Sequence, residues 1–580
     1  MPRGIPFGIA ALCFTMPVML FGCGPNAKEK QSFDGELRTV EPLEKFITAH
    51  VEKIEPLTTQ ANLAYWDAST TGNSEDYDKL GQLQLGIRRI YSNPQEYAFL
   101  KDIKESGQVS PQDASRRDVR LARQLDKLYY AYLQDQIEPA LLKKLVDLDT
   151  KIQKKYSNFR PRIDAKKVTM SDIYTIMTTE MDCRKRELAW KASKQVGDVI
   201  IDDFIELVKL RNKAARKLGF DNYHTLSIVT GEQDVEELDR VFSELDKLTA
   251  GPFARLKEDL DIILAKSYDI GVEDLMPWHY HDPFFQRTPL VYEQDLDVYY
   301  KDQDVKELVE KYYAGVGLPV DDILARSDLY DREGKYPHAF SEDVDRRGDV
   351  RILCNLQNTE RWMETILHEL GHAVYSKYHD RKEPWLLREP AHSFTTEAIA
   401  MFFGRLSRNA AWMHEMLGLS EKERTEIEKV SEKYTQFQQV LFARWAMVMY
   451  TFEKQLYANP DQDLNNLWWE LVEKYQLVRR PPGPVDAGWA SKLHFTTAPC
   501  YYHNYMLGEL LASQLHYHIV HKVFKLESDE DVSYVGQRAL GDYLRAKVLG
   551  PGALYHWNDM IARATGEPLT PKYFVEQFVK

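Results

Sequence analysis

The sequence predicts a mainly α-helical fold: one large domain with two lobes around a cleft and a few short strands. Apolar residues recur at the three- and four-residue spacing of amphipathic helices over most of 40–265. Strand-like alternation of polar and apolar residues is scarce. No internal repeat and no linker rich in Gly, Ser or Pro divides the sequence, which favours a single unit.

The elements can be placed in order along the chain. Helical spacing is clearest at Arg117–Gln136 and Val199–Leu218. Short strands are expected at His338–Ser341 and Val350–Asn355, and a proline-rich loop at Arg480–Gly488. Further helices are expected at 356–378, 395–408, 420–458, 463–476, Tyr501–Val523 and Val532–Val548.

Composition and charge exclude several classes of protein. The 580 residues are 44% hydrophobic and 12% aromatic, so intrinsic disorder is excluded for most of the chain. The net charge is −14, and no block of Lys and Arg is long enough to follow a phosphate backbone. We therefore expect no nucleic-acid partner.

The N-terminus resembles a bacterial lipoprotein signal. An apolar stretch ends at Leu20-Phe21-Gly22-Cys23, with a small residue before the cysteine that would carry the lipid. We expect a signal peptide at 1–22, lipidation of Cys23 and a tether at 23–39, which would anchor the protein to the bacterial cell envelope, on the periplasmic side of the outer membrane. The alternative is an uncleaved anchor helix, which the prolines and glycines of the stretch disfavour. The later cysteines, Cys183, Cys354 and Cys500, are expected to be free thiols.

The sharpest motif is His368-Glu369-Leu370-Gly371-His372, within an amphipathic helical stretch. Two histidines four positions apart lie on one face of a helix and can bind one metal ion. Glu369 lies beside them, where it can activate a water held by the metal. The motif predicts a Zn²⁺ site.

The third metal ligand must come from elsewhere. Glu397 lies in an apolar helical stretch, where a buried carboxylate needs a cation or a hydrogen-bond partner. Glu383 and Glu389 compete for this role, but they lie in a loop where carboxylates are usually solvated. We therefore expect Glu397 to join His368 and His372. Two His and one Glu leave a fourth position open, which is typical of catalytic zinc sites.

With these residues in place, the chain resembles the angiotensin-converting-enzyme-like zinc peptidases, peptidase family M2. The resemblance runs from about residue 40 to about residue 575 and rests on short matches spread along the chain. These matches are His338-Ala339, Trp190, Leu207–Asn212, Ala214-Ala215, Gly219-Phe220, Trp468–Leu471, Tyr475-Gln476, Pro481-Pro482, Lys492-Leu493-His494 and Tyr502-His503-Asn504-Tyr505.

The resemblance implies a fold and an activity. The fold would be a large helical zinc-peptidase (gluzincin) domain over 40–580, with two lobes around a deep central cleft. The activity would be the release of dipeptides from the C-termini of short peptides, by a monomer that meets the membrane only through its lipid anchor.

The resemblance also implies roles for individual residues. Glu369 would act as general base and then as acid, and Tyr505 would donate a hydrogen bond to the oxyanion. His494 and His338 would hold substrate carbonyl groups. The remaining implied contacts are those of Lys492 and Tyr502 with the substrate's C-terminal carboxylate and of Ala339 with the peptide backbone.

The sequence also departs from the family pattern. Asn504 stands where the animal enzymes have a chloride-binding Arg, and Met401 replaces an expected carboxylate behind the zinc ligands. A carboxylate-binding Gln has no clear counterpart, although Tyr280 is near the expected place. Because one extra residue follows His494, the pair Tyr501 and Asn504 is an alternative to the pair Tyr502 and Tyr505. We prefer the second pair because it keeps both tyrosines.

Two other hypotheses remain open. The first is an oligoendopeptidase like those of family M3, which shares the zinc motif. The second is a catalytically silent peptide-binding protein, which the intact set of His368, Glu369, His372 and Glu397 argues against.

Overall fold

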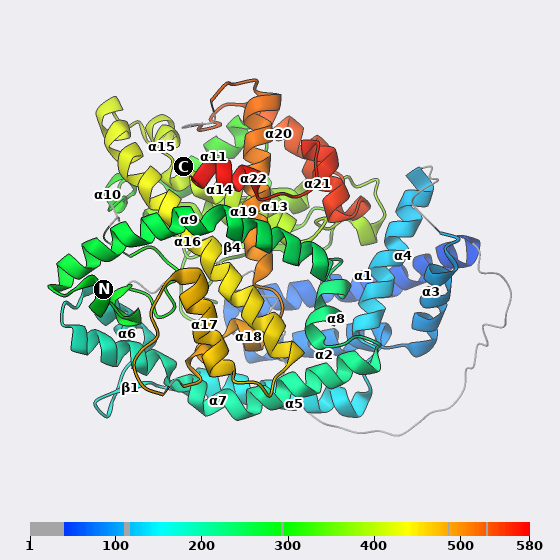
Figure 1. Cartoon of the computed structure of the whole chain (residues 1–580). Coiled ribbons are helices and arrows are strands. Elements are labelled where there is room, and N and C mark those ends of the chain that lie inside the picture. The colour runs from blue at the N-terminus through cyan, green and yellow to red at the C-terminus, as the bar shows by residue number, and fades with distance from the viewer. Residues whose placement is uncertain are drawn as a thin grey trace.

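The computed structural model describes residues 40–109, 116–289, 291, 295–484, 486–528 and 532–579. The predicted signal peptide, Cys23 and the tether lie outside these residues. Helices form most of the described chain, which confirms the mainly α-helical prediction (Figure 1). The helices are α1 Val40–Thr71, α2 Ser74–Tyr91, α3 Pro94–Ser106, α4 Arg116–Gln134, α5 Pro139–Asn158, α6 Met170–Thr179, α7 Cys183–Lys217, α8 Tyr223–Thr230, α9 Val235–Tyr268, α10 Asp297–Tyr300, α11 Val305–Gly315, α12 Asp321–Leu324, α13 Glu360–Lys377, α14 Ser393–Gly404, α15 Ala410–Leu417, α16 Glu421–Ala458, α17 Leu464–Gln476, α18 His494–Thr497, α19 His503–His518, α20 Arg538–Leu544, α21 Trp557–Thr565 and α22 Lys572–Phe578.

The strands in the described residues form two short antiparallel pairs. β1 (Arg162–Ile163) pairs with β2 (Lys166–Lys167), and β3 (Phe340–Asp343) pairs with β4 (Val350–Leu353). β3 starts two residues later than the sequence predicts.

The predicted helix Val532–Val548 is also shorter at its start. It begins only at Arg538, because the backbone at Tyr534 and Gly536 has positive φ angles (62° and 72°), which a helix does not accommodate.

One large apolar cluster runs from Leu148 on α5 to Phe578 on α22. The middle of α16 lies at its centre: every residue from Val440 to Tyr450 is buried, as expected for a helix that is apolar on most sides. α13, α14 and α19, which carry the candidate site, pack into the same cluster.

The N-terminal helices have an apolar cluster of their own. Side chains of α1, α3 and α4 pack together, and Trp385 and Leu386 join them from the loop between α13 and α14. These helices lie together at one side of the molecule (Figure 1). Within the described ranges, no helix combines the length and the apolar character needed to cross a membrane.

Candidate metal centre and substrate cleft

His368 and His372 lie one turn apart on one face of α13. The helix begins at a hydrogen bond in which the Thr359 side chain accepts from the backbone N–H of Trp362. The Nε2 atoms of the two histidines are 3.2 Å apart, so both rings are directed at the same point.

Glycines bring the third ligand to these histidines. A Cβ atom at Gly371 would lie 2.6 Å from Cα of Ala400, so only glycine lets α14 approach α13 this closely. Glu397 Oε2 then lies 3.7 Å from Nε2 of His368 and 3.8 Å from Nε2 of His372. On the far side of α14, Gly508 of α19 packs against the Cβ atom of Glu397.

The electrostatics of this group fit a metal ion. Glu397 is 1% exposed, and neither of its oxygens has a hydrogen-bond partner among the described residues. Burial raises its pKa to about 8 and lowers the pKa of His368 to about 4. A cation would satisfy the orphaned carboxylate and bind the neutral imidazoles. In the part of the chain that the structure describes, this is the one group of three or more His, Cys, Asp or Glu side chains that converges closely enough to share an ion.

Thr396 holds one of the ligands in place. Its hydroxyl oxygen lies 2.7 Å from Nδ1 of His372, so the imidazole can donate there while Nε2 faces the metal position. Sequence reasoning missed this residue. Met401 occupies the position of the expected carboxylate, and its Sδ atom packs next to Gly508 instead.

Glu369 is buried beside the ligands. Burial, together with the charges of Glu397 and Glu364, raises its pKa well above the usual range of a carboxyl group. A raised pKa suits a group that takes a proton and later returns it.

The two loop carboxylates serve another purpose. Glu383 forms an ion pair with Arg120 (2.6 Å), and Glu389 forms ion pairs with Lys127 (2.6 Å) and Arg346 (2.8 Å). Both carboxylates are therefore bound to cations rather than free in solvent.

Lys492 lies in a buried polar pocket. Its Nζ atom donates a hydrogen bond to Oε1 of Gln286 (2.6 Å) and lies 5.4 Å from the ring centre of Tyr502, whose hydroxyl accepts from Trp445 Nε1 (2.7 Å). Burial lowers the pKa of Lys492 to about 7. Gln286 was missed in the sequence, whereas Tyr280 lies elsewhere, bound to Lys257 and Asp261.

His494 lies next to two of the tyrosines. Its ring centre is 5.0 Å from that of Tyr502 and 6.4 Å from that of Tyr505. Gln286, Lys492 and His494 all line a cavity of about 190 Å³. Tyr505 lies three residues before Gly508 on α19, and so on the helix face that meets Glu397.

The tyrosine adjacent in sequence also lies near the metal group. The charge of Glu397 contributes to raising the pKa of Tyr501, after burial, and the ring centre of Tyr501 is 5.3 Å from that of Tyr505. The rings of Tyr501 and Tyr502 therefore both lie next to Tyr505, with Tyr501 near Glu397 and Tyr502 near Lys492.

His338 and Ala339 lie just before β3, which packs against α13. The ring of His338 lies against that of Tyr336, with centres 5.4 Å apart. Burial and the nearby charge of Arg361, two turns before His368 on α13, lower the pKa of His338. The neutral imidazole is thus placed beside the N-terminal half of the metal-ligand helix.

Comparisons with known proteins agree with this chemistry. The sequence model of peptidase family M3 matches residues 176–580, more than half of the chain, and this range includes His368, His372 and Glu397. The chain belongs to peptidase family M3. The model of angiotensin-converting enzyme, peptidase family M2, matches residues 38–261 and supports the M2 resemblance over that range. Peptidases of both families depend on zinc, and this M3 protein has a His-His-Glu group that could hold such an ion.

Two curated relatives are distant. Thermostable carboxypeptidase 1 from Pyrococcus furiosus is 22% identical over 259 residues, which span 41% of this chain and 51% of that protein. Oligopeptidase PepF from Bacillus subtilis is 24% identical over 234 residues, 38% of this chain and 32% of that protein. The matched segments therefore span about half of the first relative and a third of the second.

Proposed function

We propose that this M3-family protein is a zinc metallopeptidase that hydrolyses short peptides and releases dipeptides from their C-termini. The observation that carries the peptidase proposal is the convergence of His368, His372 and Glu397 beside the buried Glu369. Family membership supports the same reaction class.

The residues divide the chemistry among them. Zinc, when bound, supplies a Lewis acid that polarises the scissile carbonyl group and lowers the pKa of water. Glu369 accepts the proton of the attacking water and returns it to the leaving amine. Tyr505 donates a hydrogen bond to the developing oxyanion, and His494 and His338 hold neighbouring substrate carbonyl groups.

Lys492 supports the dipeptide-releasing mode. Its bonded partner is the neutral amide of Gln286, and no described carboxylate lies within ion-pair distance of its Nζ atom. A buried cation of this kind is suited to a substrate's C-terminal carboxylate, with Gln286 and Tyr502 beside it. Ala339, next to the edge strand β3, would pair with the peptide backbone.

A matched pair of peptides tests this mode. The free-acid and the C-terminally amidated form of one peptide are digested, and the fragments are identified by mass spectrometry. We expect dipeptides from the free acid and much slower cleavage of the amide. Equal cleavage of both forms would refute C-terminal recognition while leaving the metallopeptidase proposal intact.

An oligoendopeptidase is the second candidate. The M3 match over 176–580 favours it, because that match includes the metal ligands and the M2 match does not. Internal cleavage of amidated peptides in the same digest would establish this activity instead.

We also propose that the protein is a monomer anchored to the cell envelope by a lipid on Cys23. The motif ending at Cys23 supports this proposal. Cys23→Ala should move the protein from the membrane to the soluble fraction of cells, and an unchanged distribution would contradict the anchor. Light scattering of the detergent-solubilised protein tests the monomer.

A further inference from the structure

The turn that follows α8 contacts the start of α14, which carries Glu397, and the start of α19, which carries Tyr505. It consists of Gly231, Glu232 and Gln233, and we refer to it as the 231–233 turn. Glu232 has a φ angle of 60°, in the left-handed region, so the chain reverses sharply at this residue. As a result, three consecutive residues bind three different parts of the molecule.

Gly231 binds the start of α14, the helix that carries Glu397. His392 caps α14: its Nδ1 accepts from the backbone N–H of Phe394, and its Nε2 donates to the carbonyl oxygen of Gly231 (2.8 Å). The capped helix carries Thr396 and Glu397 in its first turns.

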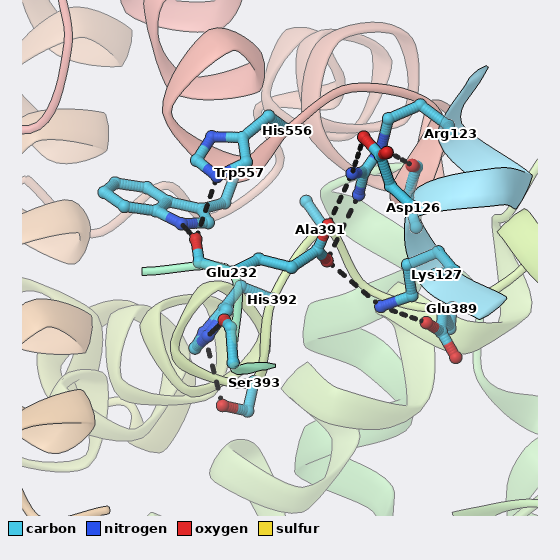
Figure 2. Close-up of polar contacts among 12 residues, drawn as sticks. Arg123, Asp126, Lys127, Glu232, Glu389, Ala391, His392, Ser393, His556 and Trp557 are labelled. Atoms are coloured by element: carbon cyan, nitrogen blue, oxygen red, sulfur yellow. Dashed lines mark hydrogen bonds and ion pairs between the residues drawn. The ribbon is translucent and has the colours of Figure 1, made fainter. Parts of the chain in front are cut away.

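Glu232 fixes the turn itself. Its carboxylate accepts hydrogen bonds from Arg123 and Lys127 on α4, and its carbonyl oxygen accepts from His556 Nε2 (2.8 Å) and Trp557 Nε1 (2.7 Å) (Figure 2). These contacts on both sides of Glu232 fix the turn, and with it the positions of Gly231 and Gln233.

Gln233 binds the start of the helix that carries the tyrosines. Its Nε2 donates to Oδ1 of Asn504 (2.8 Å), and its Oε1 accepts from Nε2 of His503 (2.7 Å). All three side chains are buried. The N-cap residue of α19, Tyr502, makes no side-chain capping bond, so these two hydrogen bonds hold the helix start from outside.

We propose that Gln233 is a positioning residue: it sets Tyr505 and Tyr502 relative to the metal group by fixing Asn504 and His503, the residues between them. The same turn contacts both helices: Gly231 binds the start of α14, and Gln233 binds the start of α19. The turn therefore fixes the position of α19 relative to α14. This inference rests on the proposed roles of the two tyrosines in peptide hydrolysis.

A double-mutant cycle in the full zinc-loaded protein tests the proposal. Gln233→Leu keeps the approximate volume and removes both hydrogen bonds. We expect kcat to fall about 10- to 100-fold, because a misplacement of about 1 Å can cost 100-fold. Because the altered contact lies on α19 rather than α14, zinc affinity should change less than about twofold. In a Tyr505→Phe background, the same substitution should have almost no further effect on kcat.

The results of this cycle distinguish a failure of the positioning role of Gln233 from a failure of the proposed role of Tyr505. An equal loss of kcat in both backgrounds would overturn the positioning role, because the effects of independent sites add. If Tyr505→Phe alone leaves kcat unchanged, the proposed role of Tyr505 fails first, and the positioning role fails with it.

The chain offers a matched control. Gln195 also donates one hydrogen bond to, and accepts one from, the backbone of Arg162, so its hydrogen bonds reach neither α14 nor α19. Gln195→Leu should leave kcat unchanged. Should Gln233→Leu fail to fold, Asn504→Ala removes one of the two hydrogen bonds from α19, and we expect a smaller loss of kcat that again disappears in the Tyr505→Phe background.

Discussion

The Thr396 hydroxyl group orients His372, one of the proposed metal ligands. Its contact with Nδ1 of His372 fixes which nitrogen of the ring faces the metal position. Thr396→Val keeps the shape of the side chain and removes the contact. We expect zinc affinity to fall about 10- to 100-fold, measured by competition with a chromophoric chelator.

Thr425→Val, on the exposed start of α16, is the control for this loss. Affinities that are equal in the two variants would show that Thr396 does not orient the ligand.

Lys492 should discriminate between substrates by their C-terminus. Lys492→Met removes a charge-assisted hydrogen bond, so kcat/KM for free-acid peptides should fall roughly 10- to 100-fold. The values for amidated peptides should change little. A parallel fall for both kinds of peptide would contradict carboxylate recognition.

The lowered pKa of Lys492 gives this discrimination a pH dependence. The ammonium group loses its proton as the pH rises through about 7, so the ratio of kcat/KM for free-acid over amidated peptides should fall there. Between about 7 and the ordinary value of 10.5, the unfolded chain binds this proton and the folded chain does not, so this residue makes stability rise with pH. A ratio that does not change with pH would refute the shift.

The sequence predicted the residues whose spacing reports on the site. His368 and His372 are one helical turn apart, and Glu397 is a charge in an apolar stretch, so local patterns were sufficient to suggest them. Thr396, Gln286 and Gln233 could not be found in this way, because each is defined by a partner distant in the chain. Thr396 offered a weak signal, since it directly precedes a predicted ligand.

At the level of elements, the close contact between α13 and α14 creates the metal group. Gly371→Ala would place a methyl group about 2.6 Å from Cα of Ala400, so the helices must separate. We expect a loss of about 1–3 kcal/mol in the free energy of unfolding. Zinc affinity should fall as well, because Glu397 moves away from the histidines.

Gly86→Ala gives the opposite expectation. Gly86 lies inside α2, and no atom lies within 4 Å of an added Cβ there. This variant should gain about 0.5–1 kcal/mol, since alanine is the better helix former. If Gly371→Ala were equally stabilising, the close packing would be wrong. Chemical denaturation and zinc titration of both variants provide the measurement.

Element types were easier to predict than their limits. The predicted helices Arg117–Gln136 and 420–458 are present as α4 and α16, because apolar periodicity and tertiary packing agree there, whereas α7 begins sixteen residues before the predicted Val199. The start of α20 did not, because the positive φ angles at Tyr534 and Gly536 leave no mark in the hydrophobic pattern.

At the scale of the whole molecule, ion pairs connect α4 to the 231–233 turn and to the loop before α14. Arg120, Arg123 and Lys127 of α4 bind Glu383, Glu232 and Glu389 in turn. Figure 2 shows Lys127 between Glu232 and Glu389. The sequence suggested none of these pairs, because their members lie more than a hundred residues apart.

This network of ion pairs should make the free energy of unfolding depend on pH. Although burial raises it, the charges of Lys127 and Arg123 lower the pKa of Glu232 to about 2. Its contribution to stability is complete above the unfolded value of 4.5 and is lost as the pH falls towards 2. Lys127→Met leaves Glu232 paired with Arg123 alone and Glu389 paired with Arg346 alone, so we expect a loss of about 1–3 kcal/mol at neutral pH. Urea denaturation at several pH values tests this, and a variant as stable as the parent at pH 7 would contradict the network.

The central claim is that Glu369 acts beside a zinc ion held by His368, His372 and Glu397. Its most direct test is the turnover of Glu369→Gln, measured together with zinc content, in the same peptide digest. We predict a fall in kcat of about 10²- to 10⁴-fold with one zinc ion still bound per chain. Unchanged turnover in the zinc-loaded variant would contradict the claim.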